Sequence, residues 1–202
     1  INSWIKAKKI IPDAVFPFGT KKIFMFSPQN MENIRKRLNI PEHNEKTLHK
    51  DFFNFLEQRD YTLSYKMPFL LSLLKNANSI GEAKIDYVLK DYIQFYKDRL
   101  NLNLPLDKKS CPYTSEFLKN EKLCKENMIA NPFEKFERKR FMFISKDLGI
   151  IAINSALWDS FSKNDILKIK TQLLEDLRNY YKNLGNIIEE NQLVNFAKGY
   201  IY

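Results

Sequence analysis

Two short patterns of acidic and basic residues have the residue types of a metal-dependent nuclease site. Pro12-Asp13 and Glu82-Ala83-Lys84 supply its two halves, and Glu137-Arg138-Lys139 repeats the second half. In such a site two carboxylates bind the metal ion and the lysine stabilises charge on the attacked phosphate. Several expected helices separate Asp13 from Glu82, and patterns this short recur by chance in a chain rich in Glu and Lys. A nuclease is therefore kept as one hypothesis beside those developed below. It requires the carboxylates of Asp13 and Glu82 to bind the same metal ion.

The other candidates for chemistry are two histidines and two cysteines. His43 and His49 are off the four-residue spacing of a helical metal pair, and Cys111 and Cys124 form no CxxC pair. The chain has only five glycines and no Gly-rich phosphate loop. We therefore expect no metal, no cofactor and no catalytic residue. Two thiols without a disulfide framework are typical of a reduced, cytoplasmic protein.

The charge balance favours a polyanionic partner. The chain carries 33 basic and 24 acidic residues, a formal net charge of +9, and basic proteins bind nucleic acids by neutralising phosphates and releasing counterions. The longest uncharged apolar run, 67–74, is far shorter than the ~20 residues that span a bilayer, so we expect no membrane partner. Because Ile1 rather than Met opens the chain, we expect one domain of a longer polypeptide.

An N-terminal segment, 1–60, is expected to pack on the rest of the chain. The alternation of apolar residues in 23–26 predicts a strand, and Ser27 followed by Pro28 predicts the start of a helix. A second helix is expected over 45–58, because its apolar residues have helical spacing.

Residues 61–100 predict a helix, a turn and a second helix. Apolar residues at helical spacing indicate one helix from Met67 and another that ends near Leu100. In a helix-turn-helix unit the second helix docks in the major groove. Four cations of this segment would then face phosphates or bases: Lys84, Lys90, Lys97 and Arg99. The alternative is an ordinary pair of antiparallel helices with a solvated charged face.

The rest of the chain is expected to be helical with a small hairpin. The expected elements are, in order, a helix over 114–127 that stops before Pro132, strands over 140–145 and 150–153, a long helix over 164–184 and a short helix near 191–197. Asp147-Leu148-Gly149 has the turn residues that join the two strands.

A second basic segment lies between residues 134 and 146. Its cations are Lys135, Arg138, Lys139, Arg140 and Lys146, and they alternate with Phe133, Phe136, Phe141 and Phe143. Basic residues interleaved with aromatic ones suit phosphate contacts and base stacking. Strand alternation alone explains the same pattern, with phenylalanines inward and charges outward. The two interpretations are compatible, because a hairpin with a basic outer face is what a winged helix uses as its wing.

Several short motifs give the chain a resemblance to known families. The motifs are Ser64-Tyr65-Lys66-Met67-Pro68 with the leucines after it, Gly81-Glu82-Ala83, 95–99, and 131–136. Across 50–185 they resemble the C-terminal region of bacterial DEAD/DEAH-box helicases of restriction or phage-defence type. They are also similar to DNA-binding modules of HNH-type restriction endonucleases, including those that read sulfur-modified DNA.

The resemblance implies an accessory, target-recognising domain of a DNA-processing machine whose motor lies upstream, with no ATP site in this chain. It also implies that Tyr65, Lys66 and the Pro132-Phe133 turn face DNA. The residues themselves favour a second interpretation, in which Tyr65 packs under the helix and only the Lys66 ammonium reaches solvent.

Together these observations predict a mainly α fold with a winged-helix-like helix-turn-helix unit and a small antiparallel β-hairpin near 140–153, in a chain divided at residue 60. We expect a non-catalytic domain of a larger helicase or restriction-type protein, which contacts duplex DNA, modified or not, mainly through backbone charge. The residues expected to face DNA are Lys66, Lys84, Lys97, Arg99, Lys135, Arg138, Lys139 and Arg140. The alternative is a protein-interaction or scaffolding module that docks on a helicase core or partner subunit, which predicts a large exposed apolar patch.

Overall fold

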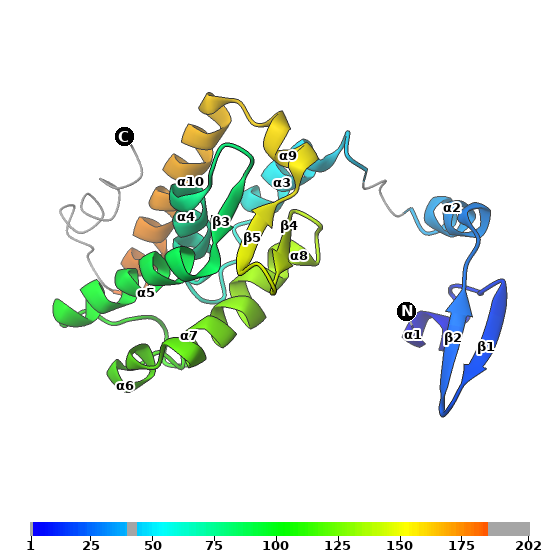
Figure 1. The fold of residues 1–202 in the computed structure, drawn as a ribbon, viewed down its shortest axis with the longest axis horizontal. Coiled ribbons are helices and arrows are strands. Elements are labelled where there is room, and N and C mark those ends of the chain that lie inside the picture. Colours follow the sequence, from blue (N-terminus) through cyan, green and yellow to red (C-terminus); the bar gives the residue numbers. More distant parts are fainter. Residues whose placement is uncertain (1, 40–43, 186–202) are drawn as a thin grey trace. The chain divides into compact units, whose positions relative to one another are not determined.

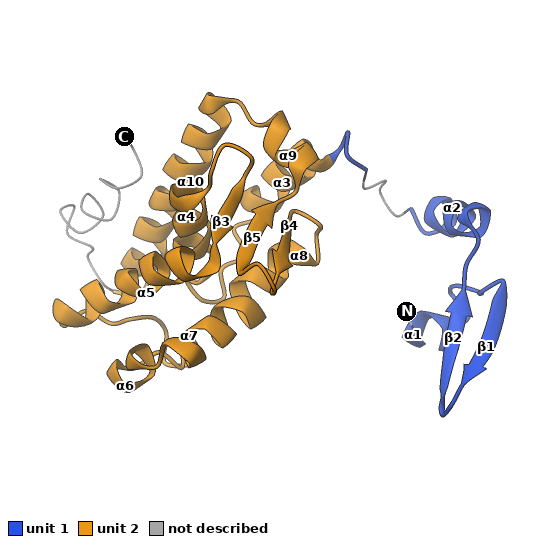
Figure 2. Ribbon diagram, in the orientation of Figure 1, with its two compact units in different colours: residues 1–47 blue, residues 48–202 orange. Residues whose placement is uncertain are grey.

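The chain divides into two compact units, 1–47 and 48–202, which we call unit 1 and unit 2 (Figure 2). The structure is a computed structural model that describes residues 2–39 and 44–185. The sequence predicts a boundary between two parts of the chain at residue 60, whereas the two compact units divide between residues 47 and 48. The reason is that the helix over Leu48–Glu57 buries Phe52 and Leu56 in the core of unit 2.

Unit 1 is a β-hairpin flanked by two short helices. Its elements are α1 (Asn2–Lys6), β1 (Ala14–Phe18), β2 (Lys21–Met25) and α2 (Pro28–Arg37). The Ser27 hydroxyl accepts a hydrogen bond from the Asn30 amide at 3.2 Å, which confirms the predicted start of α2. Among the described residues of this unit only Ile10 and Ile34 are buried apolar side chains. Unit 1 therefore has very little core of its own.

Unit 2 is mostly helical and contains a small sheet (Figure 1). Its elements are α3 (Leu48–Glu57), α4 (Lys66–Asn76), β3 (Glu82–Lys84), α5 (Ile85–Asn101), α6 (Ser115–Lys119), α7 (Glu121–Met128), the π-helix η1 (Ile129–Phe133), α8 (Glu134–Glu137), β4 (Met142–Ser145), β5 (Ile150–Ile153), α9 (Ser155–Ser160) and α10 (Lys163–Asn183). The predicted fold class, mainly helical with a small antiparallel hairpin, is confirmed at this level.

The sheet of unit 2 joins the hairpin to a strand from much earlier in the chain. Its order is β3-β5-β4, and both pairings are antiparallel. The hairpin turn ends at Gly149, whose φ of 63° is accessible to glycine at little cost. A side chain at Gly81 would meet the Trp158 ring at 2.8 Å, so glycine is required where the chain enters β3.

The helices α4 and α5 form the centre of the core. Eight consecutive residues of α4, from Met67 to Leu74, are buried, which is why this helix is apolar on every side. About half of α5 is buried, along a stripe from Ile85 to Arg99. Its opposite face is exposed and carries Asp86 and Asp98 as well as Lys90, so acids and a lysine alternate on the face that a groove-reading helix would present.

Two expected elements differ from the structure. The helix predicted over 114–127 is two helices, because the Asn120 side chain caps α7 by accepting from the Leu123 amide. Pro132 does not stop the helical run; it lies inside η1, where the wider turn accommodates a residue that donates no backbone hydrogen bond. The short helix expected near 191–197 lies outside the described residues. Across the described ranges, no helix is both long and apolar enough to cross a lipid bilayer.

Candidate functional site

A pocket beside the start of α4 brings together two cations that are far apart in the sequence. Lys66 is the first residue of α4 and Lys135 lies in α8, and both line one cavity of about 290 Å³. The other lining residues are Asp60, Thr62, Leu63, Tyr65, Asn131 and Pro132. We call this cavity the Lys66 pocket. The two stretches that form it, 60–66 and 131–135, carry motifs that the sequence indicates separately.

The ammonium group of Lys66 lies between aromatic rings. Its Nζ is 5.2 Å from the centroid of the Phe55 ring and 5.4 Å from that of the Tyr61 ring. Burial lowers the pKa of Lys66; the negative charge of Asp60 opposes this shift and the positive charge of Lys135 adds to it. Within the described part of the chain, no ion pair or hydrogen bond engages this ammonium. Its three N–H donors are therefore available to an anion.

The cations that follow Lys135 extend the same surface. Lys135, Arg138 and Lys139 are spaced three and four positions apart at the end of α8, so they share a face. The Arg138 side chain is 61% exposed, and its Nε lies 3.6 Å from a carboxylate oxygen of Glu134. An exposed ion pair of this length contributes little to stability and leaves the guanidinium accessible.

Arg140 occupies a backbone conformation that favours glycine. Its φ is 62°, and it ends α8 in a Schellman motif, with the Phe141 amide donating to Phe136 and the Arg140 amide to Glu137. The same motif ends α5, where Asn103 takes the left-handed position with a φ of 54°. Asn tolerates this conformation better than Arg. An exposed arginine therefore stands at a position where the backbone alone prefers Gly or Asn.

Lys84 and Lys97 lie away from the Lys66 pocket. Lys84, in β3, donates from its ammonium to the Leu148 carbonyl at 3.3 Å, which places it at the hairpin turn beside the exposed Lys146. Lys97 is half-buried on α5. It is close enough to Cys124 to oppose the burial that raises the pKa of that thiol. The eight cations predicted to face DNA thus do not form one cluster.

The structure corrects the predicted role of Arg99. It is only 4% exposed, its Nε donates to the Pro105 carbonyl at 2.9 Å, and its guanidinium carbon lies 3.5 Å from the centroid of the Tyr181 ring. A guanidinium committed to a carbonyl and a ring inside the core cannot reach a phosphate. The prediction that Arg99 contacts DNA is therefore wrong.

A buried network of hydroxyl groups surrounds Arg99 and holds the start of α4. Asp107 accepts hydrogen bonds from the Ser64 amide at 2.9 Å, the Ser64 hydroxyl at 2.6 Å and the Tyr180 hydroxyl at 2.5 Å. The Tyr181 hydroxyl lies 3.1 Å from Ser64 Oγ. These bonds fix the loop around residue 107 against α4 and α10. The motif that begins at Ser64 therefore has a structural role.

Two residues that the resemblance assigns to DNA are also buried. Tyr65 is 3% exposed and its ring stacks on that of Tyr113, with the ring centroids 4.9 Å apart. Phe133 is 1% exposed. The burial of both rings argues against the DNA contacts implied for Tyr65 and Phe133, and the alternative in which Tyr65 packs under the helix is confirmed.

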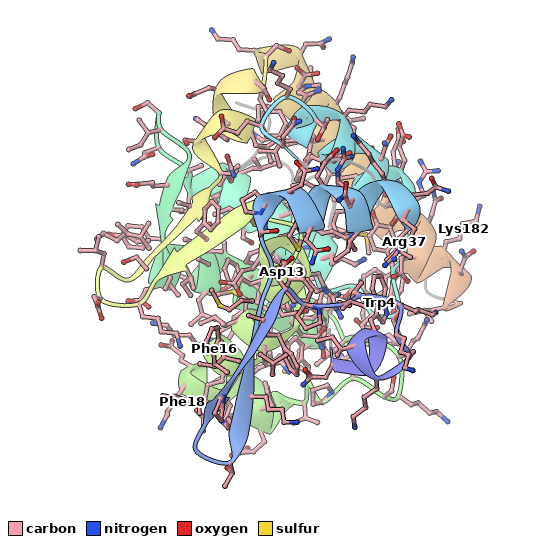
Figure 3. All side chains as sticks on the ribbon, turned by 90° about the vertical axis from the view of Figure 1, so that its right-hand side faces the viewer. Trp4, Asp13, Phe16, Phe18, Arg37 and Lys182 are labelled. Atoms are coloured by element: carbon pink, nitrogen blue, oxygen red, sulfur yellow. The ribbon has the colours of Figure 1, made fainter. Side chains whose placement is uncertain are left out.

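The residues of the nuclease hypothesis have other roles. Asp13 accepts hydrogen bonds from the Ser27 amide at 2.6 Å and from the Asn30 side chain at 2.9 Å, and these bonds hold its pKa below the usual range. Figure 3 shows it at the junction of α2 and the hairpin. Glu82 belongs to the other unit. In residues 2–39 and 44–185, no group of three His, Cys, Asp or Glu side chains could hold a metal ion.

Among the described residues, His49, Cys111 and Cys124 show no arrangement for catalysis. His49 lies 3.6 Å from Asp165, at the start of α10, and His43 lies outside the described residues. Burial raises the pKa of both Cys111 and Cys124, which disfavours the reactive thiolate. We therefore interpret Cys111 and Cys124 as packing residues.

No protein-family model matches the sequence, and neither a curated protein nor a solved structure shows significant similarity to it.

The sequence did not predict that Lys66 and Lys135 line the same pocket. It also missed Asp60 and Asn131, which line the same pocket. The available signal was the pair of motifs around Lys66 and Pro132, but their proximity depends on how α4 packs against η1, and no local pattern encodes that packing.

Proposed function

We propose that unit 2 is a non-catalytic module that binds duplex DNA mainly through its phosphate backbone. The observation that carries this proposal is the Lys66 pocket, where the half-buried and unpaired ammonium of Lys66 faces the same cavity as Lys135. Bringing two like charges together is unfavourable unless an anion binds between them. Lys135 already lies 3.8 Å from a carboxylate oxygen of Glu134, and Asp60 lines the same pocket, so the group that lacks an acceptor is the Lys66 ammonium. A phosphate oxygen supplies that acceptor together with a negative charge.

The order of elements in unit 2 supports a winged arrangement with a different recognition helix from the one expected. A helix, a short strand and a second helix, namely α4, β3 and α5, precede the helical run α7–η1–α8, which leads into the β4–β5 hairpin. The early strand β3 pairs with the hairpin. In this proposal the α7–α8 run, rather than α5, faces the groove. Lys84 and Lys146 at the hairpin turn contact the flanking backbone.

Six of the eight predicted cations remain in the proposed interface. They are Lys66, Lys84, Lys135, Arg138, Lys139 and Arg140. Glu134 and Glu137 lie among them, which reduces the local positive charge and favours moderate affinity. As an accessory part of a larger helicase or restriction-type polypeptide, the module would hold duplex DNA, modified or not, for a motor located elsewhere.

The test is fluorescence anisotropy of a labelled duplex at two salt concentrations. Six phosphate contacts lower the affinity by ~10³ between about 50 and 200 mM salt. The double variant Lys66→Gln/Lys135→Gln should reduce the slope of log affinity against log salt by about 1.8. Lys168→Gln, an exposed lysine of α10 outside the pocket, is the matched control. Affinity that does not change with salt would rule out the proposal.

We propose a second function for unit 1, a protein-interaction surface on its hairpin. Phe16 and Phe18 lie on the same side of the hairpin as Ile23 and Met25, and these four side chains are between 44% and 69% exposed (Figure 3). An isolated two-stranded hairpin is marginally stable, and exposed apolar patches mark interaction sites. Aromatic and Met side chains are typical of interface cores.

The double variant Phe16→Ser/Phe18→Ser tests this second function. A protein that co-purifies with the native chain should be lost with the variant, and the purified pair should re-form the complex in solution. Lys21→Ser/Lys22→Ser, at the hairpin tip, is a control that keeps the apolar face. A reconstituted complex that survives the double Phe variant would contradict this role.

A further inference from the structure

A second cavity is lined by other residues of the segment that leads into α4, together with residues of α10. Its volume is about 520 Å³, within the usual range for small-molecule sites. Six side chains that line it are Arg59, Tyr61, Lys108, Asn179, Tyr180 and Asn183. We call it the Tyr180 pocket. It shares no lining residue with the Lys66 pocket.

One cation of this pocket is fixed by a buried carboxylate. Arg59 Nε donates to Asp176 Oδ1 at 2.9 Å, and the Tyr61 hydroxyl donates to Asp176 Oδ2 at 2.6 Å. The Asp176 side chain is 3% exposed, whereas that of Arg59 is 62% exposed. Asp176 therefore orients Arg59 through Nε. The two terminal guanidinium nitrogens remain able to donate to an anion, because no described residue accepts from them.

The aromatic ring of the pocket is also held in place. Tyr180 donates to Asp107 Oδ1 at 2.5 Å, and the Lys108 ammonium lies 5.4 Å from the centroid of the Tyr180 ring. Lys108 itself is exposed. A fixed ring beside an exposed cation suits a ligand that carries both a planar group and a negative charge.

Two amide side chains complete the polar lining. Asn179 and Asn183 are four positions apart, so they lie on one face of α10. Both are exposed, and neither has a hydrogen-bond partner among the residues that the structure describes. An amide presents a donor and an acceptor together, the combination that reads the edge of a nucleobase.

We infer that the Tyr180 pocket binds a nucleoside monophosphate unit. The phosphate lies between Arg59 and Lys108, the base lies against the Tyr180 ring, and the two Asn side chains contact its edge. Because Asp176 is already saturated by Arg59 and Tyr61, the two cations attract an anion without a competing free carboxylate in the lining. The inference does not depend on duplex binding by the Lys66 pocket.

The experiment is isothermal titration calorimetry of the intact chain with AMP, GMP, CMP and UMP, beside adenosine and inorganic phosphate as partial ligands. A 5′-phosphorylated tetranucleotide and its unphosphorylated form distinguish a free nucleotide from a strand end. We expect at least one nucleotide or the phosphorylated tetranucleotide to bind at least tenfold more tightly than phosphate or adenosine. No binding by any of them up to about 5 mM, a range that would still reveal the weakest specific sites, would overturn the inference.

Variants separate this site from the fold and from the duplex site. Lys108→Gln should weaken binding at least tenfold without unfolding the chain, because Lys108 is exposed and makes no side-chain hydrogen bond among the described residues. Asn183→Ala should change the preference among the four bases. Lys66→Gln should leave nucleotide binding unchanged. Phosphate binding as tightly as any nucleotide, or full affinity in Lys108→Gln, would contradict the assignment.

Discussion

Two aromatic-rich regions of unit 2 differ in whether the protein supplies a hydrogen-bond acceptor to the cation that they contain. In the interior network, Arg99 lies against the Tyr181 ring and donates to the Pro105 carbonyl, with 4% of its surface exposed. In the Lys66 pocket, the ammonium also lies near aromatic rings, but no carbonyl or carboxylate of the described residues engages it. The sequence assigned both cations to DNA.

The difference shows what separates a structural cation from a binding one. Each gains from nearby aromatic rings, so the rings do not distinguish the two. What distinguishes them is whether the protein supplies the acceptors. The Nε of Arg99 has an acceptor inside the core, although no described residue accepts from its buried Nη2, whereas the N–H groups of Lys66 face a cavity that also contains Lys135.

The largest expected effect is on the interior side of the comparison. Arg99→Ala leaves a cavity and an unpaired carbonyl at Pro105, so we expect the free energy of unfolding to fall by about 2–4 kcal/mol. Urea denaturation measures this. At a temperature where the variant is folded, its affinity for duplex DNA should stay within about twofold of the native value, since additive errors of this size are ordinary for distant sites. A stable variant with lost affinity would reverse the comparison.

Asp107→Ala tests the buried network of hydroxyl groups by removing the hydrogen-bond acceptor that its members share. The Ser64 amide, the Ser64 hydroxyl and the Tyr180 hydroxyl lose their shared acceptor, so we expect a loss of about 1–3 kcal/mol in the free energy of unfolding. Asp159→Ala, which removes an exposed carboxylate of α9, should change it by less than about 0.5 kcal/mol. Equal effects of the two substitutions would show that the network contributes nothing.

Lys66→Met tests the other region of the comparison, the Lys66 pocket. We expect the free energy of unfolding to stay within about 1 kcal/mol, because the lost cation–π contacts are offset by removal of a half-buried charge. The affinity for duplex DNA at about 0.1 M salt should fall roughly eightfold, the contribution of one phosphate contact. Lys168→Met should change neither quantity. Unfolding of Lys66→Met with unchanged binding would make Lys66 a structural cation like Arg99.

Arg140→Gly separates backbone preference from charge. The φ of 62° suits glycine, so we expect the free energy of unfolding to rise by roughly 0.5–1 kcal/mol while DNA affinity falls severalfold. Asn103→Gly, at the equivalent position after α5, should leave DNA affinity unchanged. If Arg140→Gly lowers stability, its side chain contributes to the fold.

The smallest expected effect is a dependence on pH. Burial lowers the pKa of Lys66, so this residue is charged below that pKa and loses its proton before ordinary lysines, whose pKa is ~10.4. The affinity for DNA should therefore be greatest below the pKa of Lys66 and fall as the pH rises through it. Lys66→Met should show a flatter decline of affinity as the pH rises toward the usual pKa of lysine. Identical pH profiles would mean that Lys66 does not contact the duplex.

Elements that depend on neighbouring residues could be predicted from the sequence. Ser27 and Pro28 marked the start of α2, and the turn residues before Gly149 marked the hairpin. In contrast, a proline inside a helix is normally a break, so the π-helix around Pro132 was not foreseen. The candidate site was predicted residue by residue as a set of cations that face DNA. The structure places Lys66 and Lys135 at one cavity and buries Arg99 in the core.

The sequence by itself determined the helical class, the hairpin and the excess of cations, because capping, turn chemistry and periodic burial act over a few residues. Only the tertiary structure decided which cations are available. The pairing of β3 with β5 carries Lys84 to the hairpin turn, the packing of α5 against α10 encloses Arg99, and the meeting of α4 with η1 joins Lys66 to Lys135. These contacts join residues far apart in the chain, and burial is a property of the packed chain rather than of residue type.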